Sequence, residues 1–254
     1  MNKNYALHVL GAGAAQAVEL GSSGAVLERD GEPLLLIDCG PDTLTRYMDV
    51  YGAPPRALYI THLHMDHVAG LERLFYRAWF DPDLRGQVKL FAHAALVPLL
   101  QARVADYPNV VAEGGVNYWD AYHLIALSRG FWHEGLWFDI FPTRHHAPNT
   151  SFGLSLPGCF AWTGDTRPIP EMLAVHARGK TLIAHDCTLE GNPSHTGLAD
   201  LEREYDEAMR SRMLIYHYAS AEEGREFMNR GYHVAEPGMR YPLHAPDPVR
   251  ADAG

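Results

Sequence analysis

The chain has 254 residues, of which 47% are hydrophobic, with 21 Lys and Arg against 31 Asp and Glu. This length suits one large α/β domain, and the hydrophobic content excludes a disordered chain. The net charge of −10 argues against general nucleic-acid binding. Three widely spaced cysteines form no disulfide framework, so we expect a reducing compartment, the cytoplasm.

The sequence of the N-terminal half predicts strands with interspersed helices. Short apolar runs bounded by glycine and turn residues predict strands at 5–11, 24–30, 32–40 and 57–60. Helical spacing predicts helices at 43–52 and 71–80, the first ending before Pro54 and Pro55. No run of 18 apolar residues occurs, so we expect no membrane span. His8 and glycines interrupt the first apolar run, so we expect no signal peptide.

The second half repeats the alternation. We expect strands at 88–93, 136–146, 151–157, 159–165, 181–187 and 213–219, and helices at 94–107, 170–179, 198–211 and 221–231. Two strand sets with interspersed helices indicate two packed sheets with helices outside, an α/β (α+β) fold. We expect one domain over residues 1–235 and an extended Pro-rich tail over 236–254.

The strongest chemical signal is the sequence THLHMDH at 61–67, directly after the apolar strand at 57–60. In extended backbone His62 and His64 point to the same side, and the chain then turns into a helix whose first turn carries Asp66 and His67. Burying three imidazoles and a carboxylate without a partner ion would be costly. This pattern therefore predicts a metal site.

An H-x-H-x-D-H motif after a buried strand, with Gly70 behind it, resembles the metallo-β-lactamase superfamily. Further landmarks follow in that family's order: LIDCGPDTL (36–44), TGDT (163–166) and MLIYHYA (213–219). The resemblance covers residues 5–219 and implies a four-layer αββα sandwich, the metallo-β-lactamase fold. It is nearest the tRNase Z and cyclic phosphodiesterase-like branch, because of the segments SFG (151–153) and TGDT and the region around His195.

The resemblance also implies a dinuclear metal site. One ion would be bound by His62, His64 and His145, and the other by Asp66, His67 and His217, with Asp165 bridging the two. Five imidazoles and two carboxylates without a thiolate suit Zn²⁺, with Mn²⁺ or Fe²⁺ as alternatives. Asp38 is interpreted as a carboxylate that orients a ligating imidazole. His146 is the alternative to His145, since only one of two adjacent strand residues faces the site.

Catalysis needs a proton donor for the leaving group, and His195 in NPSHTGLADL (192–201) is the candidate. It resembles a histidine that follows the HEAT-like segment of tRNase Z relatives, here HDCT (185–188), in which Asp186 is expected to orient His195. We count Asp66 among the catalytic residues as well as the ligands. The alternative for His195 is a histidine on the surface of a loop.

These features predict a dinuclear metal-dependent hydrolase of a phosphodiester or related small ester that uses a metal-bound hydroxide nucleophile. The alternatives are a tRNA 3′-processing endoribonuclease and a metal-binding protein without catalysis. Residues 110–135 are neither basic nor arm-like, which makes nucleic acid an unexpected partner. We expect a small-molecule substrate and no membrane partner, and leave a homodimer open.

Two further features have less specific interpretations. The aromatic stretch at 131–138 could line a substrate pocket through Trp132 and Trp137, or pack as a hairpin. Cys187 lies beside Asp186 but has no assigned base, which favours a buried cysteine at a strand end over a nucleophile.

Overall fold

A computed structural model describes residues 3–106 and 111–248. In the first sheet β1, β2 and β3 are antiparallel neighbours, whereas β3, β4, β5 and β6 run parallel. The strand order is β14-β1-β2-β3-β4-β5-β6. The bounds are β1 (Tyr5–Gly11), β2 (Gly24–Arg29), β3 (Glu32–Ile37), β4 (Ala57–Ile60), β5 (Val88–His93), β6 (Tyr122–Leu127) and β14 (Arg240–Leu243).

The second sheet has the order β13-β12-β11-β10-β9-β8-β7. Strands β7 to β10 are antiparallel neighbours, and β10 to β13 run parallel. The bounds are β7 (Gly130–His133), β8 (Leu136–Pro142), β9 (Phe152–Leu156), β10 (Phe160–Trp162), β11 (Leu182–Asp186), β12 (Met213–Tyr216) and β13 (His233–Val234). Both sheets are therefore mixed.

The main core lies between the two sheets. Alternate residues of a strand point to opposite faces, so Leu7 and Val9 join this core while Leu10 packs in a second core outside the first sheet. Tyr59 from β4 and Trp162 from β10 are fully buried in the central core. Burial on both faces explains why these strands are continuous apolar runs in the sequence.

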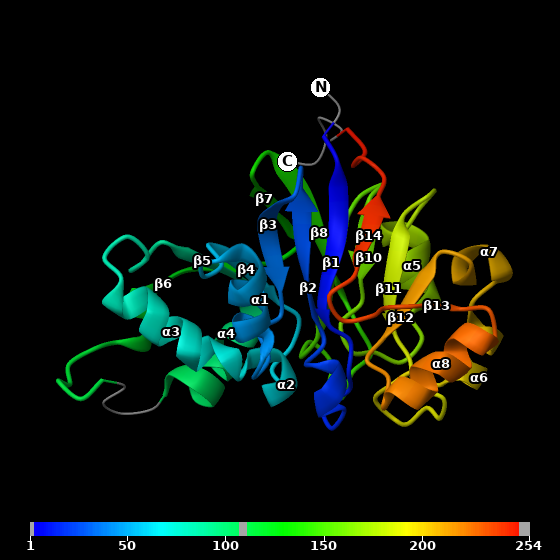
Figure 1. The fold of residues 1–254 in the computed structure, drawn as a ribbon, viewed down its shortest axis with the longest axis horizontal. Coiled ribbons are helices and arrows are strands. Elements are labelled where there is room, and N and C mark those ends of the chain that lie inside the picture. Colours follow the sequence, from blue (N-terminus) through cyan, green and yellow to red (C-terminus); the bar gives the residue numbers. More distant parts are fainter. Residues whose placement is uncertain (1–2, 107–110, 249–254) are drawn as a thin grey trace.

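Helices cover the outer face of each sheet (Figure 1). The first sheet carries α1 (Thr43–Tyr51), α2 (Met65–Val68), α3 (Gly70–Phe80) and α4 (Val97–Leu100). The second carries α5 (Pro170–His176), α6 (Leu198–Glu204), α7 (Glu207–Arg210) and α8 (Ala221–Asn229). In α3 the residues Leu71, Leu74, Phe75 and Ala78 are buried, as helical periodicity predicts. The predicted four-layer αββα sandwich is confirmed.

Short helical turns complete the chain: η1 (Val18–Leu20), η2 (Ala94–Leu96), the π-helical η3 (Gln101–Ala105) and η4 (Tyr118–Ala121). The helix expected at 94–107 is therefore a succession of 3-10, α and π turns, and its residue 107 lies outside the described residues. The helix expected at 198–211 is divided into α6 and α7, because the Asp206 side chain accepts a hydrogen bond from Met209 N (2.7 Å) and starts a new helix. Strand β6 was not predicted.

Part of the segment expected as a tail is paired. Strand β14 lies antiparallel to β1, and Arg240 contacts the buried carboxylate of Glu28 at 3.0 Å. Asp247 N donates a hydrogen bond to Pro157 O (2.8 Å). Residues 249–254 lie outside the described residues, and the division at residue 235 stays a prediction. Within the described ranges, no helix is long and apolar enough to cross a membrane.

Candidate metal centre

The histidine motif occupies the turn from β4 into α2. His62 is held by a bridge to Ser151 beside β9, and His64 is still extended (φ −68°, ψ 150°) immediately before α2. Asp66 and His67 come from the first turn of α2. The strand-to-helix turn therefore brings four side chains of the ligand type to one end of the sandwich.

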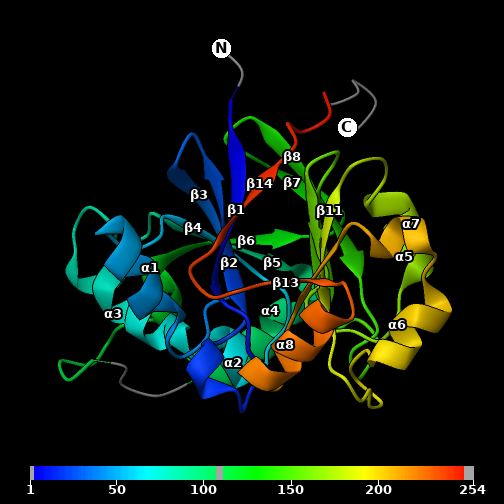
Figure 2. The same cartoon turned by 45° about the vertical axis from the view of Figure 1, so that its right-hand side comes forward.

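The remaining candidates come from the second sheet. His145 lies in the loop between β8 and β9, Asp165 follows β10, Asp186 ends β11, and His217 follows β12. Strands β10, β11 and β12 are parallel, so their carboxyl ends meet at the same edge of the sheet. Helix α2 from the first sheet and α8 from the second lie at the same end of the sandwich in both views (Figures 1 and 2). The candidates from both sheets meet at this end.

A first group of ligand atoms consists of three imidazoles and one carboxylate: His62, His64, His145 and Asp165. His64 Nδ1 lies 3.2 Å from His62 Nε2 and 3.1 Å from His145 Nε2. Asp165 Oδ2 is 3.5 Å from His62 Nε2. All four ligand atoms lie within 4.8 Å of one another, a separation that ligands of a single ion can have.

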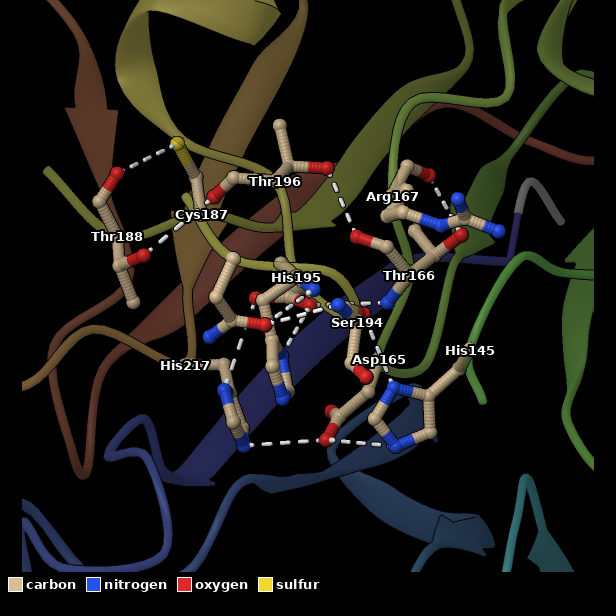
Figure 3. Close-up of polar contacts among 12 residues, drawn as sticks. His145, Asp165, Thr166, Arg167, Cys187, Thr188, Ser194, His195, Thr196 and His217 are labelled. Carbon is tan, nitrogen blue, oxygen red and sulfur yellow. Dashed lines mark hydrogen bonds and ion pairs between the residues drawn. The ribbon is translucent and has the colours of Figure 1, made fainter. Parts of the chain in front are cut away.

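A second group consists of Asp66, His67, Asp165 and His217. His67 Nε2 lies 3.4 Å from both Asp66 Oδ2 and Asp165 Oδ1. His217 Nε2 lies 3.5 Å from Asp66 Oδ2 and 3.3 Å from Asp165 Oδ2. Asp165 belongs to both groups and lies between His145 and His217 (Figure 3). The structure thus brings together all seven predicted ligands, with Asp165 in the shared position.

Unpaired buried atoms indicate whether the residues fit metal ions. Within the described part of the chain, His67 Nε2, His217 Nε2 and both carboxylate oxygens of Asp165 are buried without a hydrogen-bond partner. Each buried polar atom left unpaired costs about 1–3 kcal/mol. A cation in each group would satisfy all four atoms, and imidazole and carboxylate are ordinary ligands of divalent ions. The residues therefore fit a dinuclear site.

Outer hydrogen bonds fix which imidazole nitrogen faces the centre. Asp38 accepts a hydrogen bond from His67 Nδ1 (2.9 Å) and is held by Thr61 N (2.8 Å) and Thr61 Oγ1 (2.8 Å). His145 Nδ1 donates to Ser194 O (3.0 Å). In both histidines Nε2 is thereby left with its lone pair directed inward, as a ligand requires. The prediction that Asp38 orients an imidazole agrees with this contact.

Burial and neighbouring carboxylates set the charge of the centre. Burial acts to lower the pKa of His217, but Asp165 and Asp186 outweigh it and raise that pKa to about 10. Burial lowers the pKa of His145 to about 4. For Asp165 burial favours a higher pKa, yet His217 and His67 hold the pKa well below its usual range. The second group thus favours positive charge, while the first offers a neutral imidazole at His145.

His195 and Asp186 form a pair beside the second group. Asp186 Oδ2 lies 2.9 Å from His195 Nδ1 and accepts a hydrogen bond from Thr166 N (2.8 Å), and Asp186 Oδ1 lies 3.6 Å from His217 Nδ1. The rings of His195 and His217 stack at 5.0 Å (Figure 3). Burial acts to lower the pKa of His195, but the hydrogen bond to Asp186 outweighs it, and the pKa is raised. The protonated form of His195 therefore persists to higher pH than that of an ordinary histidine.

His146 lies outside both ligand groups. Its backbone is left-handed (φ 51°), its Nδ1 is 3.0 Å from Ser194 Oγ, and its ring lies 4.8 Å from that of His64. It lines a cleft of about 600 Å³ together with His62, His64 and His145. The geometry favours His145 as the ligand and places His146 toward the space beside the centre.

The sequence did not predict the hydrogen bonds that Ser194 and Thr61 make to groups at the centre. Ser194 acts on His145 through its backbone carbonyl, for which the side-chain sequence carries no signal. Thr61 holds Asp38 through both its backbone and its hydroxyl group. Its position immediately before the histidine motif was the available signal. Both residues fix the orientation of groups that contact the centre.

Neither of the two less specific features contributes to the cleft at the centre. Trp132 and Trp137 are directly paired across the β7–β8 hairpin, with ring centroids 5.6 Å apart, and neither lines the cleft at the centre. Cys187 is fully buried just after β11, and burial raises the pKa of its thiol. Hairpin packing and a buried cysteine are thus the interpretations that agree with the structure.

Solved structures share this fold. The metallo-β-lactamase fold protein YhfI from Bacillus subtilis has a TM-score of 0.74 and 16% identity, with 94% of this chain and 99% of that chain covered. The short form of human tRNase Z has a TM-score of 0.67 and 19% identity, with 93% and 98% covered. These likenesses show the metallo-β-lactamase fold that the sequence resemblance implied, and the paired His/Asp groups fit a metal centre.

The sequence narrows the class further. The family model described as "Anti-Pycsar protein Apyc1" matches residues 5–240. The anti-Pycsar protein Apyc1 of Saccharibacillus brassicae is 33% identical over 247 residues, covering 93% of this chain and 99% of the relative. The chain belongs to the anti-Pycsar protein Apyc1 family.

Proposed function

We propose that this protein hydrolyses a small phosphodiester at a site that holds two divalent metal ions, with Zn²⁺ the first choice. The ligands would be His62, His64 and His145 for one ion, Asp66, His67 and His217 for the other, and Asp165 for both. The donor chemistry supports Zn²⁺, because imidazole and carboxylate suit it, and it leaves Mn²⁺ and Fe²⁺ as alternatives.

Bound divalent ions supply a water activated at neutral pH, whose pKa falls to about 7, and polarise a phosphoryl oxygen. The chain's own residues orient the ligating side chains and exclude bulk water from them. Asp38 and Ser194 fix the rings of His67 and His145, and burial of Asp165 keeps its carboxylate away from bulk water. The residues around the centre are thus positioned before substrate arrives, which reduces the reorganisation that the reaction requires.

The observation that carries the proposal is the contact of His195 with Asp186 at 2.9 Å, next to His217. When a phosphodiester P–O bond breaks, the departing oxygen of an alcohol needs a proton. The His195 ring would donate that proton from Nε2, while Asp186 accepts the Nδ1 hydrogen and stabilises the charged ring. A proton donor is useful for an unactivated ester, so the pair supports an alcohol as leaving group.

The cleft and the charge support a small substrate. About 600 Å³ is the volume of an ordinary small-molecule site. A protein with a net charge of −10 lacks the general attraction that phosphate-rich polymers need. Cyclic nucleotides combine a single phosphodiester charge with an alcohol leaving group, and they are the first class to test.

Likeness to human tRNase Z supports tRNA 3′ processing as a second candidate. A tRNA needs several contacts from Lys or Arg to phosphates, and the lining of the cleft includes a single such residue, Arg103, among the described residues. We therefore place the small phosphodiester first.

The test compares bis(p-nitrophenyl) phosphate, 3′,5′-cyclic nucleotides and a tRNA precursor as substrates. Metal-loaded protein should hydrolyse the first two, chelator-treated protein should not, and added metal should restore the rate. Cleavage of the tRNA precursor in preference to every small phosphodiester would favour the second candidate. Absence of hydrolysis of every phosphodiester by protein with full metal content would contradict the proposal.

A further inference from the structure

We propose that Arg103 is the residue that selects the organic part of the substrate, by donating hydrogen bonds to acceptor atoms of a nucleobase held in the cleft. This inference rests on the proposed phosphodiester hydrolysis, since it places the reacting phosphate at the metal centre. It adds a specificity-determining residue outside the ligands and the proton donor.

Three segments line the cleft beside the centre. They are residues 62–64 of the histidine motif, residues 99–103 of the α4–η3 helical segment, and residues 145–150 of the β8–β9 loop. His62, His64 and His145 connect the cleft directly to the first ligand group. A substrate whose phosphate lies at the centre therefore has space for its organic part between the helical segment and the loop.

The lining combines apolar surface with few polar groups. The apolar residues are Leu63, Leu99, Ala102 and Ala147. Leu99 is 42% exposed, so a ligand in the cleft would cover apolar surface that otherwise faces water. The polar side chains outside the ligand group are those of Arg103, His146 and Thr150. Apolar surface suits the faces of a flat ring, whereas polar groups recognise its edge.

Arg103 has the chemistry of an edge-reading residue. Among the described residues it is the only Lys or Arg that lines the cleft, and no hydrogen bond or ion pair with another described residue occupies its guanidinium. It lies in the π-helical η3, and π turns within helices occur frequently at functional sites. The planar guanidinium can donate two parallel hydrogen bonds, as arginine does to the paired acceptors O6 and N7 of guanine.

A base contact accounts for these residues better than a phosphate contact does. The phosphate can be held by the ions and by the groups around them, whereas the helical segment would otherwise contribute no polar contact to the remainder of the substrate. A contact to the base would change the affinity for nucleotides and leave a phosphodiester without a base unaffected. This difference separates the two alternatives experimentally.

The experiment compares wild type, Arg103→Ala and Arg103→Lys, with Arg77→Ala as a control for loss of one positive charge on helix α3, away from the cleft. Substrates are 3′,5′-cyclic GMP, AMP, CMP and UMP, and bis(p-nitrophenyl) phosphate, which has no base. Metal content is measured for each variant, and binding of the nucleoside 5′-monophosphates is measured by calorimetry.

Arg103→Ala should raise the KM for the preferred cyclic nucleotide and the Kd of its 5′-monophosphate by about 5- to 100-fold. Metal content, kcat and the rate on bis(p-nitrophenyl) phosphate should remain unchanged. Arg103→Lys should recover little affinity, because an ammonium lacks the planar pair of donors. Arg77→Ala should behave as wild type.

Equal losses on every substrate would assign Arg103 to the phosphate or to the fold and would overturn the inference. Unchanged KM and Kd values would overturn it too, as would a wild type that hydrolyses bis(p-nitrophenyl) phosphate but neither binds nor hydrolyses any nucleotide. In these cases the proposed function stands. A metal-loaded wild type that hydrolyses no phosphodiester would instead contradict the proposed function itself.

Discussion

The two ligand groups of the centre differ in charge and in access. In the first group, the three imidazoles border the cleft; His64 is partly exposed, whereas His62, His145 and Asp165 are buried. In the second, His67, Asp165 and His217 are buried, and the side chain of Asp66 is only 12% exposed. The second group also has Asp38 and Asp186 behind its histidines. One half of the centre therefore borders the cleft and is rich in imidazole, and the other lies away from the cleft and is richer in carboxylate.

This difference indicates that the two ions would have different affinities and different roles. Carboxylates inside and behind the second group add negative charge in a region shielded from water, so an ion there should be held more tightly. The first group faces the cleft, so an ion there would meet the substrate. We therefore expect gradual chelation to remove the first ion before the second.

The largest effect is expected at the residue that the two groups share. Asp165→Ala should remove at least one ion and nearly all activity, because its oxygens lie within 3.5 Å of His62, His67 and His217. Elemental analysis and the rate on bis(p-nitrophenyl) phosphate check this. Asp139→Ala, on β8 away from the centre, is the control. Full metal content and full rate in Asp165→Ala would show that the two groups share no ligand.

The next effect concerns the proposed proton donor His195, whose ring lies 4.9 Å from that of His145 and 5.0 Å from that of His217. His195→Ala should keep both ions but lower kcat by about 10²–10⁴-fold on esters of poor leaving groups. Esters of p-nitrophenol need no proton and should lose far less. A lost ligand would impair both kinds of ester and release metal. An unchanged rate on a cyclic nucleotide that the wild type hydrolyses would remove His195 from the mechanism.

The pKa of His195 adds a pH test. A donor acts in its protonated form, which is present below its pKa and lost above it. Because Asp186 raises this pKa, the rate on poor leaving groups should persist to higher pH than with an ordinary histidine, and fall as pH rises through the raised value. The p-nitrophenyl esters should lack this decline. Identical alkaline profiles for the two kinds of ester would contradict the assignment.

A smaller effect is expected at Asp38, whose carboxylate lies behind the second ligand group. Asp38→Asn should weaken metal affinity by about 10–100-fold without abolishing folding, because the carboxylate orients His67 and strengthens it as a ligand. The loss should concern the tightly held ion. Competition with a chromophoric chelator measures it, with Asp49→Asn on α1 as the control. Unchanged affinity for both ions would assign Asp38 a role in folding alone.

The smallest effect is expected for His146→Ala, which should retain both ions, because His146 does not belong to either ligand group. The matched variant His145→Ala should lose the ion of the first group, because His145 Nε2 faces His64. Metal content of the two variants compares them directly. Retention in His145→Ala together with loss in His146→Ala would reverse the ligand assignment.

The sequence predicted the centre better than it predicted its surroundings. Apolar runs located β4 at its observed bounds, but the strands predicted at 159–165 and 213–219 end earlier, at Trp162 and Tyr216. The compact motif after β4 suggested a metal, and the family resemblance supplied Asp165 and His217 as further ligands. The choice between His145 and His146 could only be argued from strand alternation. In the structure β8 ends at Pro142, so strand alternation does not extend to these residues, and His146 has a left-handed backbone (φ 51°) and lies outside both ligand groups.

Local sequence patterns could not predict contacts between residues that are far apart in the chain. Ser194 O reaches His145 across 49 residues of sequence, and β14 pairs with β1 across the whole chain. The break between α6 and α7 depends on Asp206 as a helix cap, which periodicity does not detect. Long-range pairing and caps override the simple alternation of apolar residues. For the same reason the sequence did not predict the cleft, which is lined by three segments that are distant in the chain.

Metal stoichiometry tests the central claim most directly. Protein dialysed against excess Zn²⁺ and then freed of unbound metal should contain two ions per chain by elemental analysis. Stepwise removal by a chelator should lose one before the other, and hydrolysis of bis(p-nitrophenyl) phosphate should stop when the first ion is lost. One ion per chain at full activity, or activity retained in metal-free protein, would contradict a dinuclear hydrolase.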